Sequence, residues 1–244
     1  MPTDAPVFTE SIALSSETLQ MAVTEVSRCA PNDSAYENAK NPSELGYHSY
    51  SLSKNDNEIE TYPHRFFYHH RSQLANYAES AGGLVRDHIN ALLSYIQASQ
   101  GQVHDEADGL IAQGKIQRSH LEMLFCPNDI VLAKTAGSLA AYVLRAWPQG
   151  GSTISLDCWA WGFDGNWLHR KSETLTVLRP PHEQISIRDL EVFPLRFATP
   201  EELEQLRTRG QKFWNLRYQS FVTYNGWDAK AEQFYVSYPV SAII

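Results

Sequence analysis

Apolar side chains recur every three or four residues between residues 74 and 96, which is the spacing of one face of an α-helix. Gly82-Gly83 interrupts this pattern, so the sequence predicts two helices that meet at the glycine pair. A further short helix is predicted over residues 106–113, with Gly114 following its C-terminus. The aromatic run YPHRFFY at residues 62–68 predicts a strand or an anchoring loop ahead of these helices.

An extended region is predicted from Ile130 to about Leu178, after a turn at Pro127-Asn128-Asp129. Its clearest part is SLDCWAWGF-DG-NWLHRKSETLTVL, residues 155–178, in which two alternating strands flank Asp164-Gly165. An Asp-Gly pair is typical of a two-residue hairpin turn because both residues tolerate positive φ. Side chains alternate between the two faces of a strand. One face of the first strand would therefore carry Trp159, Trp161 and Phe163, and the other Cys158, Ala160 and Gly162.

A closing helix is predicted to begin at Thr199-Pro200-Glu201-Glu202, which is a capping box with proline at the first helical position. The buried stripe of this helix would consist of Leu203, Leu206, Gly210 and Phe213. The predicted fold class is therefore α+β. It comprises N-terminal helices, an antiparallel β-sheet with a tight Asp-Gly hairpin, and a closing C-terminal helix.

Charge divides the 244-residue chain unevenly. Residues 1–60 hold ten acidic and three basic side chains, whereas the rest is almost neutral in a chain of net charge -8. The first part is also rich in Ser, Thr, Asn and Pro, and such a composition buries too little apolar surface to offset chain entropy. Residues 1–60 are therefore predicted to be mostly disordered, with a transient helix between Ile12 and Val26 that lacks a local partner. Residues 61–244 are predicted to form a single α+β domain.

Composition argues against several classes of protein. No stretch approaches the roughly 18 apolar residues that a membrane span needs, and the mean hydropathy is -0.38. An acidic chain is also a poor electrostatic match for nucleic acid. The first residues do not resemble a signal peptide, and three scattered cysteines make neither a disulfide framework nor a zinc motif. We therefore expect neither nucleic acid nor a membrane as a partner, and an intracellular, cytoplasmic location.

The sequence contains no complete catalytic or cofactor motif. Residues 109–115 fit GxxxxGK, but Ile116 follows where a P-loop needs a Ser or Thr hydroxyl for magnesium. His64, His69 and His70 lie close together without the second group of ligands that a zinc site usually has. We therefore expect no cofactor, no metal and no catalytic residue, which favours a protein that is not an enzyme.

Two groups of side chains are candidates for an interaction surface. The first is aromatic and lies on the hairpin, and the second is a basic edge at the end of the closing helix. They are Trp159, Trp161 and Trp167, and Arg207, Arg209, Lys212 and Arg217, respectively. A row of aromatic rings on a strand stacks a sugar or a partner segment when it is open, and forms core when a helix covers it. The apolar stripe of residues 200–214 favours the covered arrangement.

Three stretches carry a resemblance to a known family. They are GKIQRSHLEMLFCPNDIVLAK at residues 114–134, LDCWAWGFDGNWL, and ISIRDLEVFPLRFATPEELEQLRTRGQKFWNL at residues 185–216, with Tyr224-Asn225-Gly226 after them. In this order and spacing they resemble an uncharacterised domain that lies N-terminal to AAA-type ATPase modules in filamentous-fungal proteins. The resemblance covers roughly residues 85–240, and Asn128 stands where the family tends to have glycine.

The resemblance implies a function through protein contacts, with the ATPase module or its substrate as the partner. The nucleotide-binding motifs of that family lie beyond this region, so these residues are expected to be a stand-alone or truncated copy without ATPase activity. Our leading hypothesis is a non-catalytic protein-interaction or regulatory domain. The alternative is a small-ligand or carbohydrate-binding module that uses the aromatic strand face.

Overall fold

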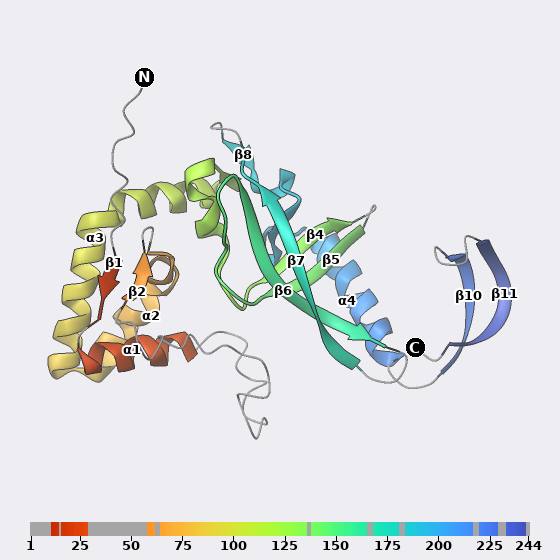
Figure 1. The fold of residues 1–244 in the computed structure, drawn as a ribbon, viewed down its shortest axis with the longest axis horizontal. Helices are drawn as coiled ribbons and strands as arrows, with labels where there is room; N and C mark the ends of the chain where they lie inside the picture. The colour runs from red at the N-terminus through yellow and green to blue at the C-terminus, as the bar shows by residue number, and fades with distance from the viewer. Residues whose placement is uncertain are drawn as a thin grey trace.

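The chain folds as an α+β protein in a computed structural model (Figure 1). A helical part precedes a five-stranded antiparallel sheet, and a helix follows the sheet, as the sequence predicts. The residues described by the structure are 11–14, 16–28, 58–61, 64–135, 138–164, 168–180, 184–216, 220–228 and 233–242.

Helices α2 (Arg65–Ala81) and α3 (Gly83–Ala112) form the predicted pair around Gly82-Gly83. Both glycines have positive φ, 65° and 55°, a backbone conformation that side chains with a Cβ atom rarely adopt. The glycine pair therefore ends one helix and begins the next, which confirms the break predicted from the sequence.

Helix α1 (Glu17–Arg28) has a packing partner, contrary to the prediction of an unpartnered transient helix. Its apolar face lies against α2 and α3 in one buried cluster. The fully buried members are Leu14, Leu19, Ala22, Val23, Val26, Phe66, Phe67, Leu74, Ala78, Ile89, Leu92 and Ile96. The partner surface lies some fifty residues further along the chain, which is why local periodicity did not reveal it.

Strand β1 (Ser11–Ala13) also pairs with β2 (Glu58–Thr61). Residues 1–10, 15 and 29–57, which make up most of the segment predicted to be disordered, lie outside the described residues, and the division at residue 60 stays a prediction.

The aromatic run before the helices is itself helical from Arg65 onward, so the strand or anchoring loop predicted there is wrong. Phe66 and Phe67 are 5% and 0% exposed, with their rings edge to face at 5.5 Å between centroids. Aromatic residues favour strands intrinsically, but burial of these two rings in the helical cluster outweighs that preference.

Helix α3 continues without a break through the region predicted as a separate short helix at residues 106–113. Its buried face runs from Ile96 through Gln100 and His104 to Leu110 at helical spacing. Two of these four positions are polar, so the hydrophobic pattern fades although the buried face continues. Gly114, with φ of 69°, follows the end of the helix as predicted.

The sheet has the strand order β7-β6-β5-β4-β9, and every neighbouring pair is antiparallel. The turn at Pro127-Asn128-Asp129 precedes β4, and Asn128 has φ of 71°. The strands are β4 (Ile130–Thr135), β5 (Ser138–Leu144), β6 (Thr153–Phe163), β7 (Leu168–Leu178) and β9 (Val192–Pro194). Short elements accompany the sheet: β3 (Lys115–Ile116), η3 (Arg118–Leu124), β8 (Ile185–Ser186), η4 (Ile187–Asp189) and η5 (Leu195–Phe197).

The β6–β7 hairpin is present, and its register pairs Phe163 with Leu168. Four residues therefore connect the strands, two more than the two-residue turn predicted at Asp164-Gly165. A shift of two residues keeps every side chain on its face, because the period of a strand is two. The predicted division of β6 into two faces is therefore unaffected.

Helix α4 (Pro200–Asn215) begins with the predicted capping box, in which Thr199 and Glu202 each bond the backbone of the other. The predicted buried stripe is only partly correct, because no residue of α4 is fully buried and Gly210 is exposed. Leu206 is partly buried against the core of the sheet. The last described elements, β10 (Ser220–Asp228) and β11 (Gln233–Ala242), pair with each other.

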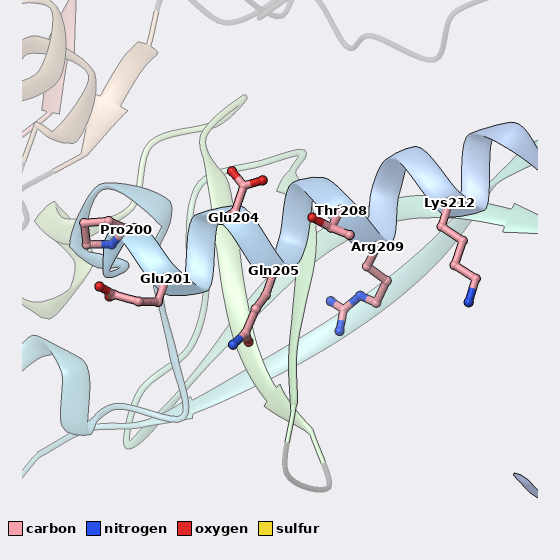
Figure 2. Close-up of a pocket in the computed structure, with 7 residues that line it drawn as sticks. All are labelled: Pro200, Glu201, Glu204, Gln205, Thr208, Arg209 and Lys212. Carbon is pink, nitrogen blue, oxygen red and sulfur yellow. The ribbon is translucent and has the colours of Figure 1, made fainter.

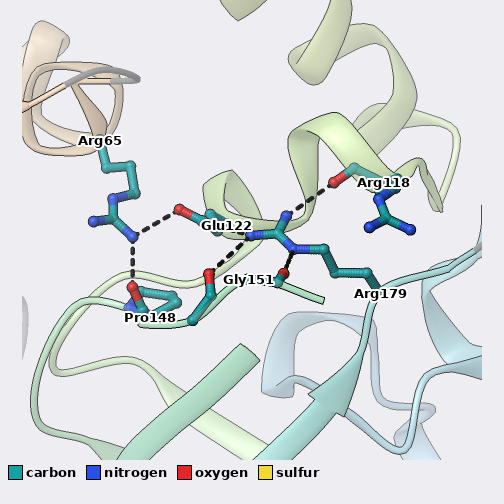
Figure 3. A network of polar contacts seen from close by, with 7 residues as sticks. Arg65, Arg118, Glu122, Pro148, Gly151 and Arg179 are labelled. Atoms are coloured by element: carbon teal, nitrogen blue, oxygen red, sulfur yellow. Dashed lines mark hydrogen bonds and ion pairs between the residues drawn. The ribbon is translucent and has the colours of Figure 1, made fainter. Parts of the chain in front are cut away.

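A network of polar contacts joins the helical part to the sheet (Figure 3). Arg65, at the start of α2, donates to Glu122 at 2.9 Å and to the carbonyl oxygen of Pro148 at 2.6 Å. Arg179, just after β7, donates to the other carboxylate oxygen of Glu122 and to the carbonyl oxygen of Gly151. These side chains of Arg65, Glu122 and Arg179 are 18%, 19% and 13% exposed, so water screens their charges little.

Candidate interaction surface

The two tryptophans of β6 lie on the face of the hairpin opposite the buried side chains of the same strand. Cys158 is fully buried in the core of the sheet, as are Leu156 and Ile154. Trp161 is 53% exposed, and Trp159 is half-buried. The prediction that the closing helix covers the aromatic face is therefore wrong for Trp161. Trp167, the third aromatic candidate, lies outside the described residues.

Arg170 of β7 packs against both tryptophans. Its guanidinium carbon lies 4.4 Å from the ring centroid of Trp159 and 5.8 Å from that of Trp161, which it faces directly across the strand pair. The two indoles are 5.6 Å apart and meet edge to face at 89°. Stacking of a guanidinium on an indole combines cation–π attraction with apolar contact, so it holds the rings in a defined arrangement. We call Trp159, Trp161 and Arg170 the aromatic–arginine face.

A polar group adjoins this face toward the middle of the sheet. Arg145 donates to the Ser172 hydroxyl at 3.1 Å and lies 3.8 Å from a carboxylate oxygen of Asp157. Ser172 pairs with Trp159 in the hairpin register. Sequence reasoning missed Arg145 and Arg170. The signal for Arg170 was available, because even the predicted two-residue turn places it across from Trp159.

The basic edge predicted on α4 carries mixed charge. Arg209 and Lys212 line a hollow along the helix together with Glu201 and Glu204, which lie nearer its N-terminus (Figure 2). Arg207 lies 3.9 Å from Glu204, and Arg209 donates to the carbonyl oxygen of Leu139 on β5. The acids near the start and the bases near the end match the helix dipole. Arg217 lies outside the described residues.

The histidines considered as metal ligands belong to the interior of the helical part. His64 and His104 are buried, and the Tyr68 ring lies 4.9 Å from His69 and 5.1 Å from His104 between ring centroids. Burial lowers the pKa of His69 to about 3 and also lowers the pKa of His104, so both imidazoles are neutral near pH 7. Within the described ranges no group of three or more His, Cys, Asp or Glu side chains is placed to hold a metal ion.

The two described cysteines are not activated as nucleophiles. Cys158 is fully buried, and Cys126 is partly buried. Burial raises the pKa of each thiol to about 12, so both remain protonated at neutral pH. A protonated thiol is a poor nucleophile and a poor metal ligand.

Comparison with known proteins gives one match. Residues 106–199 are similar to DUF7025, a domain of unknown function. The matched segment runs from the last turns of α3 through the whole five-stranded sheet to Thr199, and it contains the aromatic–arginine face. No curated protein and no solved structure matches the chain. Among the helices that the structure describes, none has the length and apolar character needed to cross a membrane.

Proposed function

We propose that the chain is a non-catalytic protein-interaction domain whose aromatic–arginine face binds an extended segment of a partner protein. The observation that carries this proposal is the half-exposed Trp161 in contact with Trp159 and beside Arg170. Tryptophan and arginine dominate the binding energy of protein interfaces because each buries a large area and also makes directional contacts. Their arrangement on a paired hairpin means that little conformational entropy is lost on binding.

The edge of β6 beside Trp161 supports an extended partner. Among the described residues, the ladder between β5 and β6 consists of Val143 with Trp159 and Leu144 with Cys158. From Ala160 to Phe163, β6 pairs with β7 on one edge. On its other edge this part of β6 has no ladder partner among the described residues. An added strand gains affinity from backbone hydrogen bonds at such an edge and specificity from neighbouring side chains. The exposed Trp161 ring would supply that specificity.

The proposed partner is an AAA-type ATPase module or a substrate of such a module. This part of the proposal rests on the resemblance carried by residues 114–134 and 185–216, which overlaps the DUF7025 match. The proposal includes a cytoplasmic location and no nucleic acid partner, and for both it relies on composition and a net charge of -8.

The alternative, a carbohydrate-binding module, is favoured by the exposure of Trp161 but not by the geometry of the pair. A sugar stacks on the open flat face of an aromatic ring. The indoles of Trp159 and Trp161 are nearly perpendicular, and the Arg170 guanidinium already lies over Trp159. The surface therefore presents two perpendicular indoles and a guanidinium group, and it lacks the open flat ring on which a sugar stacks.

Titration calorimetry against a purified AAA-type ATPase module of the resembling family tests the proposal. We expect saturable binding that weakens at least about tenfold in Trp161→Ala and in Arg170→Ala, the loss typical of an interface hot spot. Trp214→Ala is the matched control, because Trp214 is 52% exposed and belongs to α4 rather than to the hairpin. No binding, or equal losses in the control, would overturn the proposal.

A parallel titration with a panel of oligosaccharides, followed by tryptophan fluorescence, tests the alternative. A saturable signal that disappears in Trp161→Ala would favour carbohydrate binding over protein binding. Absence of any signal at millimolar sugar would eliminate it.

A further inference from the structure

A hollow of about 400 Å³ lies beside the polar network that joins the helices to the sheet. Its described lining contains two arginines, an amide, a hydroxyl and a glycine, and no acidic side chain. The lining residues are Gln117, Arg118, Ser119, Gly151 and Arg179. Concentrated positive charge is unusual in a chain of net charge -8, so this hollow differs from the average surface. We call it the Arg118–Arg179 hollow.

Arg179 is held rigidly at one side of the hollow. It donates to Glu122, to the carbonyl oxygen of Gly151, and to the carbonyl oxygen of Arg118 at 3.2 Å. Glu122 also accepts from Arg65, so one carboxylate faces two guanidinium groups. One positive charge of this group therefore remains uncompensated. A fourth contact, to the carbonyl oxygen of Gly150 at 3.5 Å, leaves Arg179 one N–H donor, so it attracts an anion mainly by its charge.

Arg118 contributes a second guanidinium that is uncommitted. It lies at the first position of η3, and its side chain is exposed and makes no hydrogen bond or ion pair within the described part of the chain. In Figure 3 its carbonyl oxygen carries a dashed line to Arg179, whereas its guanidinium carries none. The five N–H donors of this group are therefore available to a ligand.

Gln117 and Ser119 form a neutral polar rim at the hollow. The Gln117 amide nitrogen lies 3.1 Å from the Ser119 hydroxyl oxygen and 2.9 Å from Nδ1 of His120. The Ser119 hydroxyl oxygen also lies 2.9 Å from Nδ1. An amide nitrogen only donates, so the amide and the hydroxyl share the acceptor at Nδ1. The hydroxyl is therefore engaged within this group, and the charged donors of the hollow are its arginines.

We propose that the Arg118–Arg179 hollow binds a phosphate monoester group. Such a group carries close to two negative charges at neutral pH and presents several acceptor oxygens, which match the free guanidinium donors of Arg118 and the uncompensated charge at Arg179. A carboxylate offers one charge and two oxygens, so it would leave part of the donor set unused. The same phosphate chemistry is found in free inorganic phosphate and in a phosphorylated side chain. This site is separate from the aromatic–arginine face and does not depend on the function proposed for it.

Titration calorimetry at constant ionic strength tests the proposal with three probes: inorganic phosphate, a phosphoserine peptide and the same peptide with serine. We expect saturable binding of phosphate and of the phosphopeptide, and none of the serine peptide. A tighter phosphopeptide identifies a phosphorylated protein as the source, and equal affinities identify the free anion. Arg118→Ala should weaken binding about tenfold or more, since hydrogen bonds to charged groups contribute that much.

Arg207→Ala is the matched control, because Arg207 is also an exposed arginine and lies on α4, outside the hollow. Arg118→Ala removes no contact of the fold, and its circular dichroism should equal that of the unsubstituted chain. Trp161→Ala should keep full phosphate binding, which separates this proposal from the function proposed above. Absence of saturable phosphate binding, or equal weakening in Arg207→Ala, would overturn it.

Discussion

The guanidinium group of Arg65 donates to Glu122 at 2.9 Å, across a sequence separation of 57 residues. Arg65 begins α2, whose apolar side chains belong to the helical cluster. Glu122 lies on η3, whose Leu121 and Leu124 belong to the core of the sheet. The second oxygen of Glu122 accepts from Arg179. One carboxylate therefore connects three parts of the chain that are distant in sequence.

Replacement of Glu122 should lower stability substantially. Glu122→Gln keeps the size of the side chain but leaves two largely buried arginines without their counter-charge. Removal of one partner of such a group costs about 3 kcal/mol. Chemical denaturation monitored by circular dichroism measures the free energy of unfolding. Glu204→Gln, at an exposed ion pair, is the control and should change that energy by no more than about 0.5 kcal/mol.

Stability should fall as the pH drops below about 6.5, which is the ordinary pKa of histidine. Burial lowers the pKa of His69, His70, His104 and His120 in the folded chain, so the unfolded chain binds more protons in this range. The contribution of these neutral histidines to the free energy of unfolding is fully present above pH 6.5. It is lost progressively as the pH falls toward each lowered pKa. His69 alone, with a pKa of about 3, accounts for about 2 kcal/mol at pH 5.

Unfolding free energies measured between pH 5 and 7.5 test this dependence. His69→Gln should flatten the profile, whereas Gly151→Ala, which removes no titratable group, should leave its slope unchanged. A profile that is flat in the unsubstituted chain would contradict the neutral state assigned to the buried imidazoles.

Gly150 and Gly151 offer a matched pair of substitutions in one loop. Gly150 has φ of 125°, and a Cβ atom there would collide with the carbonyl oxygen of Thr153. Gly150→Ala should therefore cost about 2 kcal/mol or more. A Cβ atom on Gly151 meets nothing within 4 Å, so Gly151→Ala should be nearly neutral. Midpoints of thermal unfolding distinguish the two, and equal midpoints would show that the loop relaxes freely.

The hydroxyl of Thr199 should contribute about 1 kcal/mol through its bond to the backbone nitrogen of Glu202. Thr199→Ala removes this bond and should lower the midpoint of urea unfolding. Thr199→Ser retains the hydroxyl and should restore most of the loss. If both variants lose the same stability, the cap contributes nothing and the methyl group is responsible.

Local signals in the sequence predicted those elements whose cause is itself local. The glycine pair at Gly82-Gly83, the capping box at Thr199 and the alternating strands of the hairpin each follow from backbone or side-chain chemistry within a few residues. The predicted fold class was based on local signals of this kind, as were the limits of the extended region near Ile130 and Leu178.

Long-range packing decided the features that sequence reasoning missed. Helix α1 gains its partner from residues far along the chain, and the helical conformation at Phe66 and Phe67 depends on burial rather than propensity. Polar Gln100 and His104 occupy buried positions of α3 and hide its continuity. The exposure of Trp161 depends on which face of the sheet packs against the core. The structure shows that this is the face of Ile154, Leu156 and Cys158, which the alternation of side chains in the sequence does not reveal.

The boundaries of the DUF7025 match bear on how the chain should be divided for experiments. The match starts at residue 106, well inside α3, and ends at Thr199, the residue that caps α4. A fragment cut there would begin in mid-helix, lose the Arg65 partner of Glu122, and keep a cap without its helix. We expect such a fragment to aggregate when expressed, and residues 11–216, which keep the apolar face of α1 on α2 and α3, to yield monodisperse protein. The stretch that similarity detects is therefore shorter than the unit that must fold together.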